Sequence, residues 1–472
     1  DLFQPSPPWH CHEPEYVDRE VPVKRMPELP DVSIINEYVA AYYESPIRLS
    51  FPVIDHSLFS NTLHLGLQNS SNLSSGRASS RACLCAFLSL SAFWGLHEKN
   101  PVPIDSLALV SKAEKYIPQI LQEETLDGLQ AILMLMIFHC SSGNFRKGLY
   151  LDSLTARLIF RFGAHVMSPP TPGGATSLDN GCLPQMGSHL RNLFWIAYSL
   201  DKELSIRTGQ PAAIQDEVCD LTVPQGYGDQ LSILLSSGEH GLAGSKDYLY
   251  PVDLRLIKIK SRAYSAFYGP GCLCMSDIDL FKTIRGLDND LEEWRLSIPS
   301  NYRPKLSTSQ KITTGNHFFG MHAVLLQMDY YNCVAIIHQA CGRCVAWASN
   351  QSSIVSVGSS FTLAVESSRS SLLSLKNHFS VLPRGTFWPI VFYPLSACLT
   401  IFCNIVLDPT SLHAAQDLEL LDYTSTLITG LSTAQFQLPK SVHICRLESL
   451  VTELSELAKV AVTETQKDQP LS

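Results

Sequence analysis

The segment that most constrains the fold runs from Arg191 to Pro224. Its first part carries apolar residues at every third or fourth position, the spacing that places side chains on one face of a helix. These residues are Leu193, Ile196, Ala197, Leu200 and Leu204. The helix must stop near Gly209-Gln210-Pro211, because glycine adopts backbone angles that other residues resist and the residue before a proline avoids the helical region. The segment therefore predicts a helix with one buried face, a sharp break and a short stretch ending at Val223-Pro224.

Apolar residues recur with similar spacing along most of the chain, and they predict a succession of helices. The predicted ranges are 31–43, 81–97, 103–117, 124–140, 144–162, 191–206, 254–267, 277–296, 318–348, 360–380, 388–407 and 443–460. Residues 69–80, 168–188 and 225–248 are rich in Ser, Gly or Pro and are predicted to be loops. No stretch shows the sustained alternation of a half-buried strand. We therefore expect an all-α fold: a large multi-helix domain with long loops and little or no sheet.

Residues 191–224 also resemble the signature of a known family. Phe194-Trp195 is followed by a helix that contains Leu200-Asp201-Lys202, then by Gly209-Gln210-Pro211, Ala213-Ile214-Gln215-Asp216 and Asp220–Pro224. This order resembles the fungal-specific transcription factor domain. That domain is the regulatory region found C-terminal to the zinc binuclear-cluster DNA-binding motif of fungal activators.

Three weaker motifs resemble the same family. Phe51-Pro52-Val53-Ile54-Asp55, with Phe59 four residues later, resembles the opening of the domain. A pair of predicted helices ends at Phe162-Gly163-Ala164-His165, which departs at one apolar position from the family's ending A-x-x-L-G-L-H. Residues 284–299 resemble the element L-x-x-L-x-x-W-x-x-x-x-P. The resemblance covers residues 32–407 in order, and its motifs consist of packing residues and turn formers.

The resemblance implies a regulatory or effector domain of a fungal zinc-cluster-type transcription factor, acting in the nucleus on transcription by RNA polymerase II. The implied organisation is a linker at 1–30, the regulatory domain at 31–410, a C-terminal helical extension at 411–460 and a disordered tail at 461–472. No catalytic, cofactor-binding or metal-binding residue is predicted, so the chain is expected not to be an enzyme. Two alternatives stay open: an interaction scaffold of the same fold that does not bind DNA, and an enzyme built on the same helical body.

Charge and cysteine spacing argue against DNA binding by this chain itself. The formal net charge is −9, whereas a DNA-binding domain needs a basic surface to neutralise phosphates. A zinc binuclear cluster needs six cysteines within about thirty residues, and residues 1–80 contain one, Cys11. The chain is either cut after such a cluster or never had one. We expect zinc only in an upstream cluster, and DNA contact only through that missing N-terminal module.

The 14 cysteines do not show the spacing of a disulfide framework. Several lie in apolar helical runs, where a reduced thiol packs as a small hydrophobe, and they indicate a reducing compartment. These are Cys83, Cys85, Cys140, Cys333, Cys398 and Cys403. Cys341-Gly342-Arg343-Cys344 is interpreted as core packing, with a redox or metal role as the alternative, and His10-Cys11-His12 as a solvated segment rather than a metal site. The triplets at Asn69, Asn72 and Asn350 are expected to occur by chance rather than as glycosylation sites.

Titratable residues on the apolar helices have a structural and a functional interpretation. His139 and His338 are predicted to be hydrogen-bonded core histidines rather than general bases. Asp201-Lys202-Glu203 and Arg207 are predicted to form ion pairs between neighbouring helical turns. The alternative is that they line a cavity for a small-molecule effector, with the loop 225–248 as its lid. The helices expected to wall that cavity are 126–140, 191–206 and 318–340.

The uncharged stretch 388–407 is long enough to cross a membrane. Two prolines near its start, Pro389 and Pro394, and Asn404 near its end favour a helix buried on all sides in a large helical protein. We therefore expect no membrane partner.

Two segments suggest regulation. Ser79 and Ser80 lie beside arginines in a stretch predicted to be an exposed loop, which makes them candidates for phosphorylation. In 443–460, leucines recur at heptad-like spacing with acidic residues between them. Such a helix either packs onto the body or binds a partner, so a homodimer and transcriptional co-regulators are the expected protein partners. The leucines are Leu447, Leu450, Leu454 and Leu457.

Overall fold

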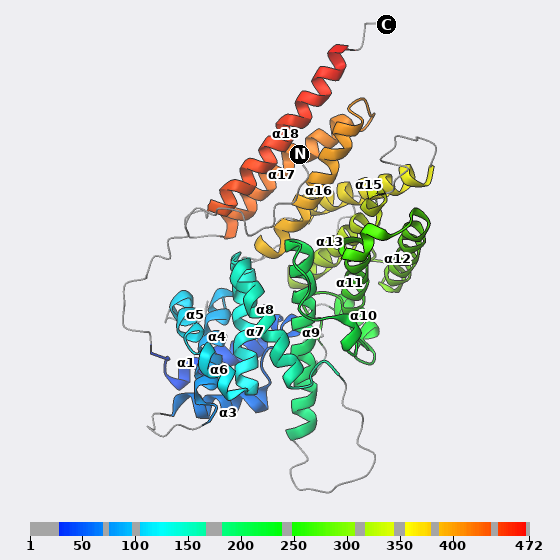
Figure 1. Ribbon diagram of the computed structural model, residues 1–472. Coiled ribbons are helices and arrows are strands. Elements are labelled where there is room, and N and C mark those ends of the chain that lie inside the picture. The colour runs from blue at the N-terminus through cyan, green and yellow to red at the C-terminus, as the bar shows by residue number, and fades with distance from the viewer. Residues whose placement is uncertain are drawn as a thin grey trace.

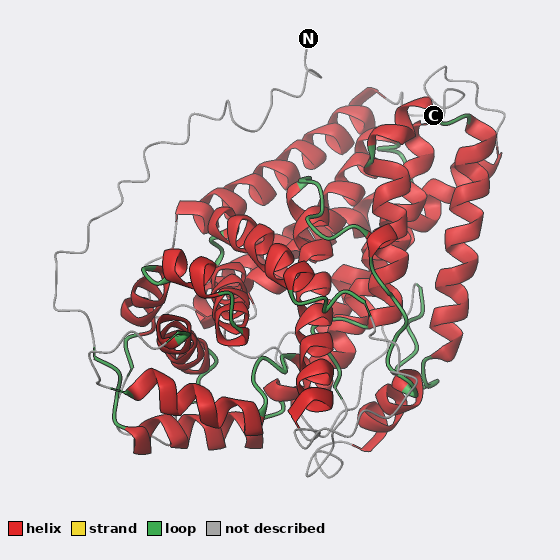
Figure 2. Ribbon diagram, turned by 60° about the horizontal axis from the view of Figure 1, so that its bottom comes forward, coloured by secondary structure: helices red, strands yellow, loops and turns green. Residues whose placement is uncertain are grey.

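The computed structural model confirms the all-α prediction: throughout the described residues the regular structure is helical, and no strand occurs in them (Figure 2). The structure describes residues 28–68, 75–96, 104–166, 182–237, 248–306, 317–343, 355–378, 387–435 and 442–468.

The helices of the first half lie on one side of the molecule, and those of the second half lie on the other, with α9 between them (Figure 1). The first half contains α1 (Val32–Glu44), α2 (Ile47–Ser50), α3 (His56–Leu67), α4 (Arg77–Phe93), α5 (Ser106–Glu114), α6 (Ile117–Glu123), α7 (Leu126–Ser142), α8 (Phe145–Arg161) and α9 (Cys182–Thr208). The second half contains the 3₁₀ turn η2 (Asp216–Val218), α10 (Tyr227–Ser237), α11 (Leu254–Tyr268), η4 (Pro270–Cys274), α12 (Asp277–Ser297), α13 (His317–Gln339), η5 (Ala340–Arg343), α15 (Val355–His378), α16 (Phe387–Leu407), α17 (Ala414–Gln435) and α18 (Val442–Asp468).

The molecule has two hydrophobic cores, one mainly in each half. The first core is built around α7, which is buried without interruption from Gly128 to His139 and packs against α4 and α8. Thr125 begins this helix by accepting a hydrogen bond from the Gly128 amide, and Gly143 ends it with a φ of 85°. The second core joins α11–α13 with α15–α18. Helix α7 is apolar on every side, so it is stable in water only when other helices surround it, and this explains its central place in the first core.

Several predicted boundaries are corrected by the structure. The helix predicted at 103–117 ends earlier, at Glu114, and a separate helix, α6, begins at Ile117, because Pro118 fits the first turn of a new helix and not the interior of a long one. The range 225–248 contains α10, whose Tyr227, Leu231 and Leu235 recur every fourth residue and are buried. Residues 238–247 of that range lie outside the described residues.

The C-terminal region also differs from its prediction. Residues 411–460 contain two helices, α17 and α18, and Leu421 and Val451 from them belong to the same core as α13 and α16. Helix α18 continues to Asp468, so the part of the predicted tail up to that residue is helical. The predicted linker 1–30 lies outside the described residues up to position 27.

Candidate functional site

The signature helix α9 has the geometry that its spacing predicts. Leu193, Ile196 and Ala197 are fully buried, and the break falls at Gly209, which has a φ of 70°. The chain then returns along α9, because both carboxylate oxygens of Asp201 accept hydrogen bonds from backbone amides of the returning segment, at 2.7 and 3.2 Å. The amides belong to Ala213 and Ile214.

A first group of charges, the loop cluster, is buried or half-buried and fixes this returning segment. It consists of Asp152, Asp201, Lys202 and Asp216. Lys202 Nζ donates to the carbonyl of Ile214 and lies 3.3 Å from Asp201 and 3.2 Å from Asp216. Asp216 also accepts from the hydroxyls of Tyr198 and Ser261, at 3.0 and 2.8 Å. The Leu-Asp-Lys motif therefore acts as an anchor for the stretch that follows it.

The loop cluster carries more carboxylates than cations. Asp152 comes from α8 and is 4% exposed. Burial, reinforced by the neighbouring Asp201, raises the pKa of Asp152 to about 9. Asp152 therefore keeps its proton at neutral pH and can donate it to Asp201, while its Oδ1 atom has no hydrogen-bond partner.

A second group, the junction cluster, lies where the two cores meet. It consists of Glu203 and Arg207 from α9, Lys260 from α11, Asp329 from α13 and Tyr393 from α16. Lys260 Nζ donates to Glu203 and, at 2.7 Å, to Asp329, which also accepts from the Tyr393 hydroxyl at 2.7 Å. Arg207 donates to Glu203 at 3.0 Å and its guanidinium lies over the rings of Phe392 and Tyr393.

The charges of the junction cluster balance. Burial alone would lower the pKa of the Lys260 ammonium, but Asp329 and Glu203 raise it above its usual value. Burial alone would raise the pKa of Glu203, but Lys260 and Arg207 hold it below its usual value. Burial raises the pKa of Asp329, and its bonds to Lys260 and Tyr393 oppose this rise. The cluster thus pairs two carboxyl groups with two cations and ties four helices together.

The predicted ion pair of Glu203 with Arg207 is present. The contacts of Lys260 with Glu203 and Asp329 were not predicted. Lys260 and Asp329 were not singled out from the sequence, although each carried a signal. Lys260 stands three and four residues after Ile257 and Leu256, on the apolar face of α11, and Asp329 is an acid within the apolar run 323–337. A charge on a buried helical face requires a buried partner.

The two histidines are core residues, as predicted. His139 Nε2 lies 2.7 Å from Glu114, and His338 lies 2.8 Å from the hydroxyl of Ser360 and 3.3 Å from Asp288. Both rings are buried.

Two hollows are found among the described residues, and neither lies at the predicted cavity between α7, α9 and α13. Side chains of the junction cluster link α9 to α13 instead. One hollow, of about 470 Å³, lies between the start of α17 and the end of α18. The other, of about 10 Å³, has room for one water molecule between α13, α15 and α16, and Asn332 lines it with a buried Oδ1 that has no hydrogen-bond partner.

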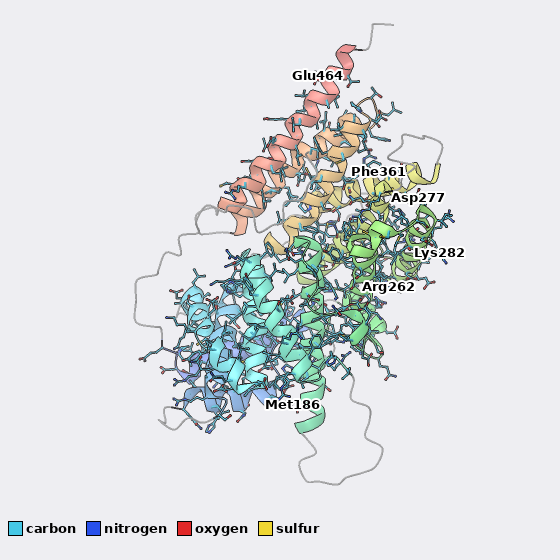
Figure 3. All side chains as sticks on the ribbon, in the orientation of Figure 1. Met186, Arg262, Asp277, Lys282, Phe361 and Glu464 are labelled. Carbon is cyan, nitrogen blue, oxygen red and sulfur yellow. The ribbon has the colours of Figure 1, made fainter. Side chains whose placement is uncertain are left out.

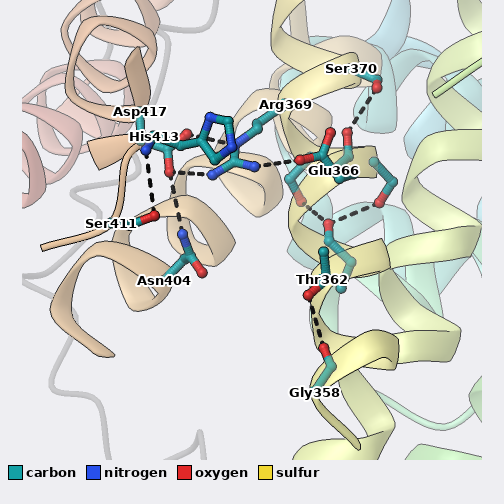
Figure 4. Close-up of polar contacts among 12 residues, drawn as sticks. Gly358, Thr362, Glu366, Arg369, Ser370, Asn404, Ser411, His413 and Asp417 are labelled. Carbon is teal, nitrogen blue, oxygen red and sulfur yellow. Dashed lines mark hydrogen bonds and ion pairs between the residues drawn. The ribbon is translucent and has the colours of Figure 1, made fainter. Parts of the chain in front are cut away.

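A third charged contact joins α15, α16 and α17 (Figure 4). Arg369 of α15 makes two 2.7 Å bonds to Asp417 of α17, whose side chain is fully buried. Asn404 of α16 donates to the same carboxylate at 3.3 Å, and Glu366 pairs with the other side of the guanidinium. This contact ties α17, whose start lines the larger hollow, to α15 and α16.

The two serines that the sequence suggests as phosphorylation sites lie inside the protein. The prediction that Ser79 and Ser80 lie in an exposed loop is wrong: Gly76, with a φ of 91°, starts α4 just before them, and both are fully buried. Their hydroxyls donate to Glu123 and Asp127.

The cysteines that the structure describes are free thiols. Cys341 is buried in the second core, as predicted, whereas Cys403 is exposed and not packed inside an apolar helix as expected. Cys344, His10-Cys11-His12 and the three Asn-x-Ser triplets lie outside the described residues. Within the described ranges, no three His, Cys, Asp or Glu side chains are grouped to hold a metal ion.

Helix α16 is not buried on all sides as expected. It is the one helix of the described part that is long and apolar enough to span a membrane, and half of that apolar stretch, Pro389–Leu407, is buried. It packs against α13, α15, α17 and α18, while Leu399 and Val406 face outward.

Comparison with known proteins shows that the chain is similar to fungal transcription factors. It is 28% identical over 360 residues to the ABC-transporter-regulating transcription factors of Aspergillus fumigatus and of Aspergillus oryzae, covering 72% of this chain and 37% of each relative. It is 22% identical over 306 residues to the fusaridione A cluster transcription factor of Fusarium heterosporum, covering 63% of this chain and 53% of that protein. No family model matches the chain. The chain thus spans little more than a third of the Aspergillus relatives, and its relatives are fungal transcription factors, which confirms the resemblance seen in its motifs.

Proposed function

We propose that this chain is the regulatory region of a fungal transcription factor that acts in the nucleus on genes transcribed by RNA polymerase II. The observation that carries the proposal is the similarity to named transcription factors along 72% of the chain. The signature helix α9 supports it, because its motif residues form the anchor of the returning segment and the centre of the junction cluster.

We propose that DNA is bound by another part of the protein. A net charge of −9 opposes binding to phosphates, and the described residues offer no metal-binding group that could serve as a zinc cluster. The coding sequence upstream of Asp1 tests this directly. Six cysteines in a basic stretch of about thirty residues support the proposal, and a complete gene without such a stretch favours the scaffold alternative.

The regulatory step is proposed to act at the junction between the two cores. A small-molecule effector or a co-regulator shifts a protein between two conformations only if it binds them with different affinity. The junction cluster is suited to such a change, because its charges are satisfied only when α9, α11, α13 and α16 keep their present arrangement. A shift of one core against the other breaks several of these bonds together.

A tethering experiment tests the regulatory role. The chain, fused to an unrelated DNA-binding domain, is expected to change expression of a reporter gene in a fungal cell. The same fusion carrying Arg262→Ala, a substitution at an exposed ion pair, serves as the matched control and is expected to behave as the unmodified fusion. Reporter expression that is the same with and without the tethered chain, at equal protein levels, contradicts the proposal.

We propose that the chain has no enzymatic activity. The buried side chains of His139, Lys260 and Asp329 are engaged in ion pairs and hydrogen bonds and do not line the larger hollow, whose lining offers a single cation, Lys459. Turnover of a candidate substrate that is lost on Asp329→Asn, with the fold retained, is the result that would favour an enzyme instead.

The names of the two Aspergillus relatives suggest which genes to examine first. Both are called ABC-transporter-regulating transcription factors. We therefore propose that the protein controls genes for ABC transporters. Deletion of its gene in the fungus that encodes it is expected to change several-fold the transcript level of at least one such transporter, and unchanged transporter transcripts would remove this part of the proposal.

A further inference from the structure

Helix α18 presents one bound face and one open face. Its bound face packs into the second core through Val451 and Ala458, both fully buried. Beside them, Ser455 and Lys459 donate to Asp422 of α17, Lys459 at 2.7 Å. Leu447 and Leu454 are half-buried against the same core. Two of the four heptad leucines are therefore used for packing onto the body.

The other two leucines point outward. Leu450 and Leu457 are 42% and 50% exposed, and Val460 is 51% exposed. Together with three charged residues they form a stripe along the exposed side of α18, here called the outer stripe. Its residues follow one another at intervals of four and three, the a and d spacing of a coiled coil. The outer stripe consists of Arg446, Leu450, Glu453, Leu457, Val460 and Glu464.

The position of α18 leaves this stripe accessible. The helix lies at the edge of the molecule and its C-terminal part extends past the neighbouring helices (Figure 1). Glu464 marks that far part of the helix (Figure 3). From Arg446 to Glu464 the stripe spans about 27 Å, at about 1.5 Å per residue.

The charges at the two ends of the outer stripe meet opposite charges in only one orientation of two such helices. In an antiparallel pair centred on position 455, Arg446 meets Glu464 of the second copy at both ends, Leu450 meets Val460, and Glu453 meets Leu457. In a parallel pair, Arg446 would face Arg446, Glu453 would face Glu453 and Glu464 would face Glu464. Like charges in register are destabilising.

We infer that the outer stripe binds a second copy of this chain, with the two α18 helices antiparallel about a two-fold axis near position 455. The inference does not depend on the proposed role in transcription. Two symmetric Arg446–Glu464 pairs close the ends, Leu450 and Val460 of the two copies cover one another, and Leu457 packs against the aliphatic part of Glu453 of the second copy. A single helix pair is smaller than a standard interface, so the dimer dissociates on dilution.

Sedimentation velocity of the whole chain over a range of concentrations tests the inference. A monomer–dimer equilibrium is expected, and Leu457→Glu is expected to shift it toward monomer by at least tenfold in Kd without changing the helical circular dichroism signal or the melting curve of the monomer. Ile278→Glu is the matched control, because Ile278 is 81% exposed on α12 and lies outside the stripe. A wild-type chain that stays monomeric at every concentration overturns the inference.

Charge exchange tests the antiparallel arrangement separately. Arg446→Glu and Glu464→Arg should each weaken the dimer several-fold, because each places like charges opposite one another. The double variant should restore dimerisation, since both pairs are re-formed with reversed sign. A parallel dimer, a dimer through another surface, or a co-regulator helix on the stripe would give no such recovery, and absence of recovery overturns the proposed geometry.

Discussion

The loop cluster and the junction cluster lie along the same helix, yet they satisfy buried charge in different ways. The junction cluster sets two carboxyl groups, Glu203 and Asp329, against two cations, Lys260 and Arg207. The loop cluster has three carboxylates and one ammonium, Lys202, so one carboxyl, Asp152, keeps its proton. A buried charge thus needs either an opposite charge or a shifted pKa, and α9 shows both solutions within three turns.

The largest effect should come from breaking the balance of the junction cluster. Lys260→Met keeps the length of the side chain but leaves Glu203 and Asp329 buried without their shared cation. We expect a loss of about 3–5 kcal/mol in the free energy of unfolding, because removing one partner of a buried ion pair leaves an uncompensated charge. Urea unfolding at pH 7, followed by circular dichroism, measures it.

A double variant gives the control for this prediction. Lys260→Met combined with Asp329→Asn removes one of the two stranded charges, so it should be more stable than Lys260→Met alone. If the double variant is less stable by the sum of the two single losses, the residues are not coupled and the description of the cluster is wrong.

The stability contributed by the loop cluster should depend on pH through Asp152. Asp152 has a raised pKa of about 9 in the folded chain, so between pH 4 and pH 9 the folded state holds a proton that the unfolded state has lost. Stability therefore falls as pH rises through this window. Asp152→Asn keeps a hydrogen-bond donor for Asp201 and removes the titration. We expect it to stabilise the chain by about 1–3 kcal/mol at pH 8, discounting the full shift for coupling between the two carboxyls.

The pH dependence of stability distinguishes the loss of a titrating carboxyl in Asp152→Asn from a gain in packing. The stability difference between Asp152→Asn and wild type should be near zero at pH 4 and should increase toward pH 9, measured by urea unfolding at each pH. A difference that stays constant across this range contradicts the shifted pKa. Asp422→Asn is a useful comparison, because the pKa of Asp422 is lowered by its bonds to Lys459 and Ser455 despite partial burial, so this variant should lose stability at pH 7 relative to pH 3.

How much of each cluster could be predicted depends on how far apart the interacting residues lie in the sequence. The helix α9, its break at Gly209 and the Glu203–Arg207 pair depend on residues a few positions apart, and apolar spacing and turn chemistry indicate them. Lys260 and Asp329 are 69 residues apart, and only the packing of α11 against α13 brings them together. The sequence could indicate that each needs a partner, but not which one.

The same limit explains the errors in the fold. Helix α10 was missed because its buried positions, Tyr227, Leu231 and Leu235, are surrounded by the glycines and serines of a predicted loop. The outward face of α16 was missed because composition makes a half-buried apolar helix look like a fully buried one. The heptad of α18 was visible, but its division into a packed and an exposed pair of leucines depends on where α17 lies.

The smallest effect is expected from a charge pair that belongs to neither cluster. Arg262 of α11 lies 2.5 Å from Asp290 of α12, but both side chains are largely exposed, at 57% and 38% (Figure 3 labels Arg262). Water and salt screen such a pair, so Arg262→Ala should cost less than about 1 kcal/mol and less still at high ionic strength. Because Lys260 stands two residues earlier on the same helix, the two variants compare a buried and an exposed cation. Urea unfolding in low and high salt measures both, and a loss for Arg262→Ala as large as that for Lys260→Met would show that burial is not what gives the junction cluster its importance.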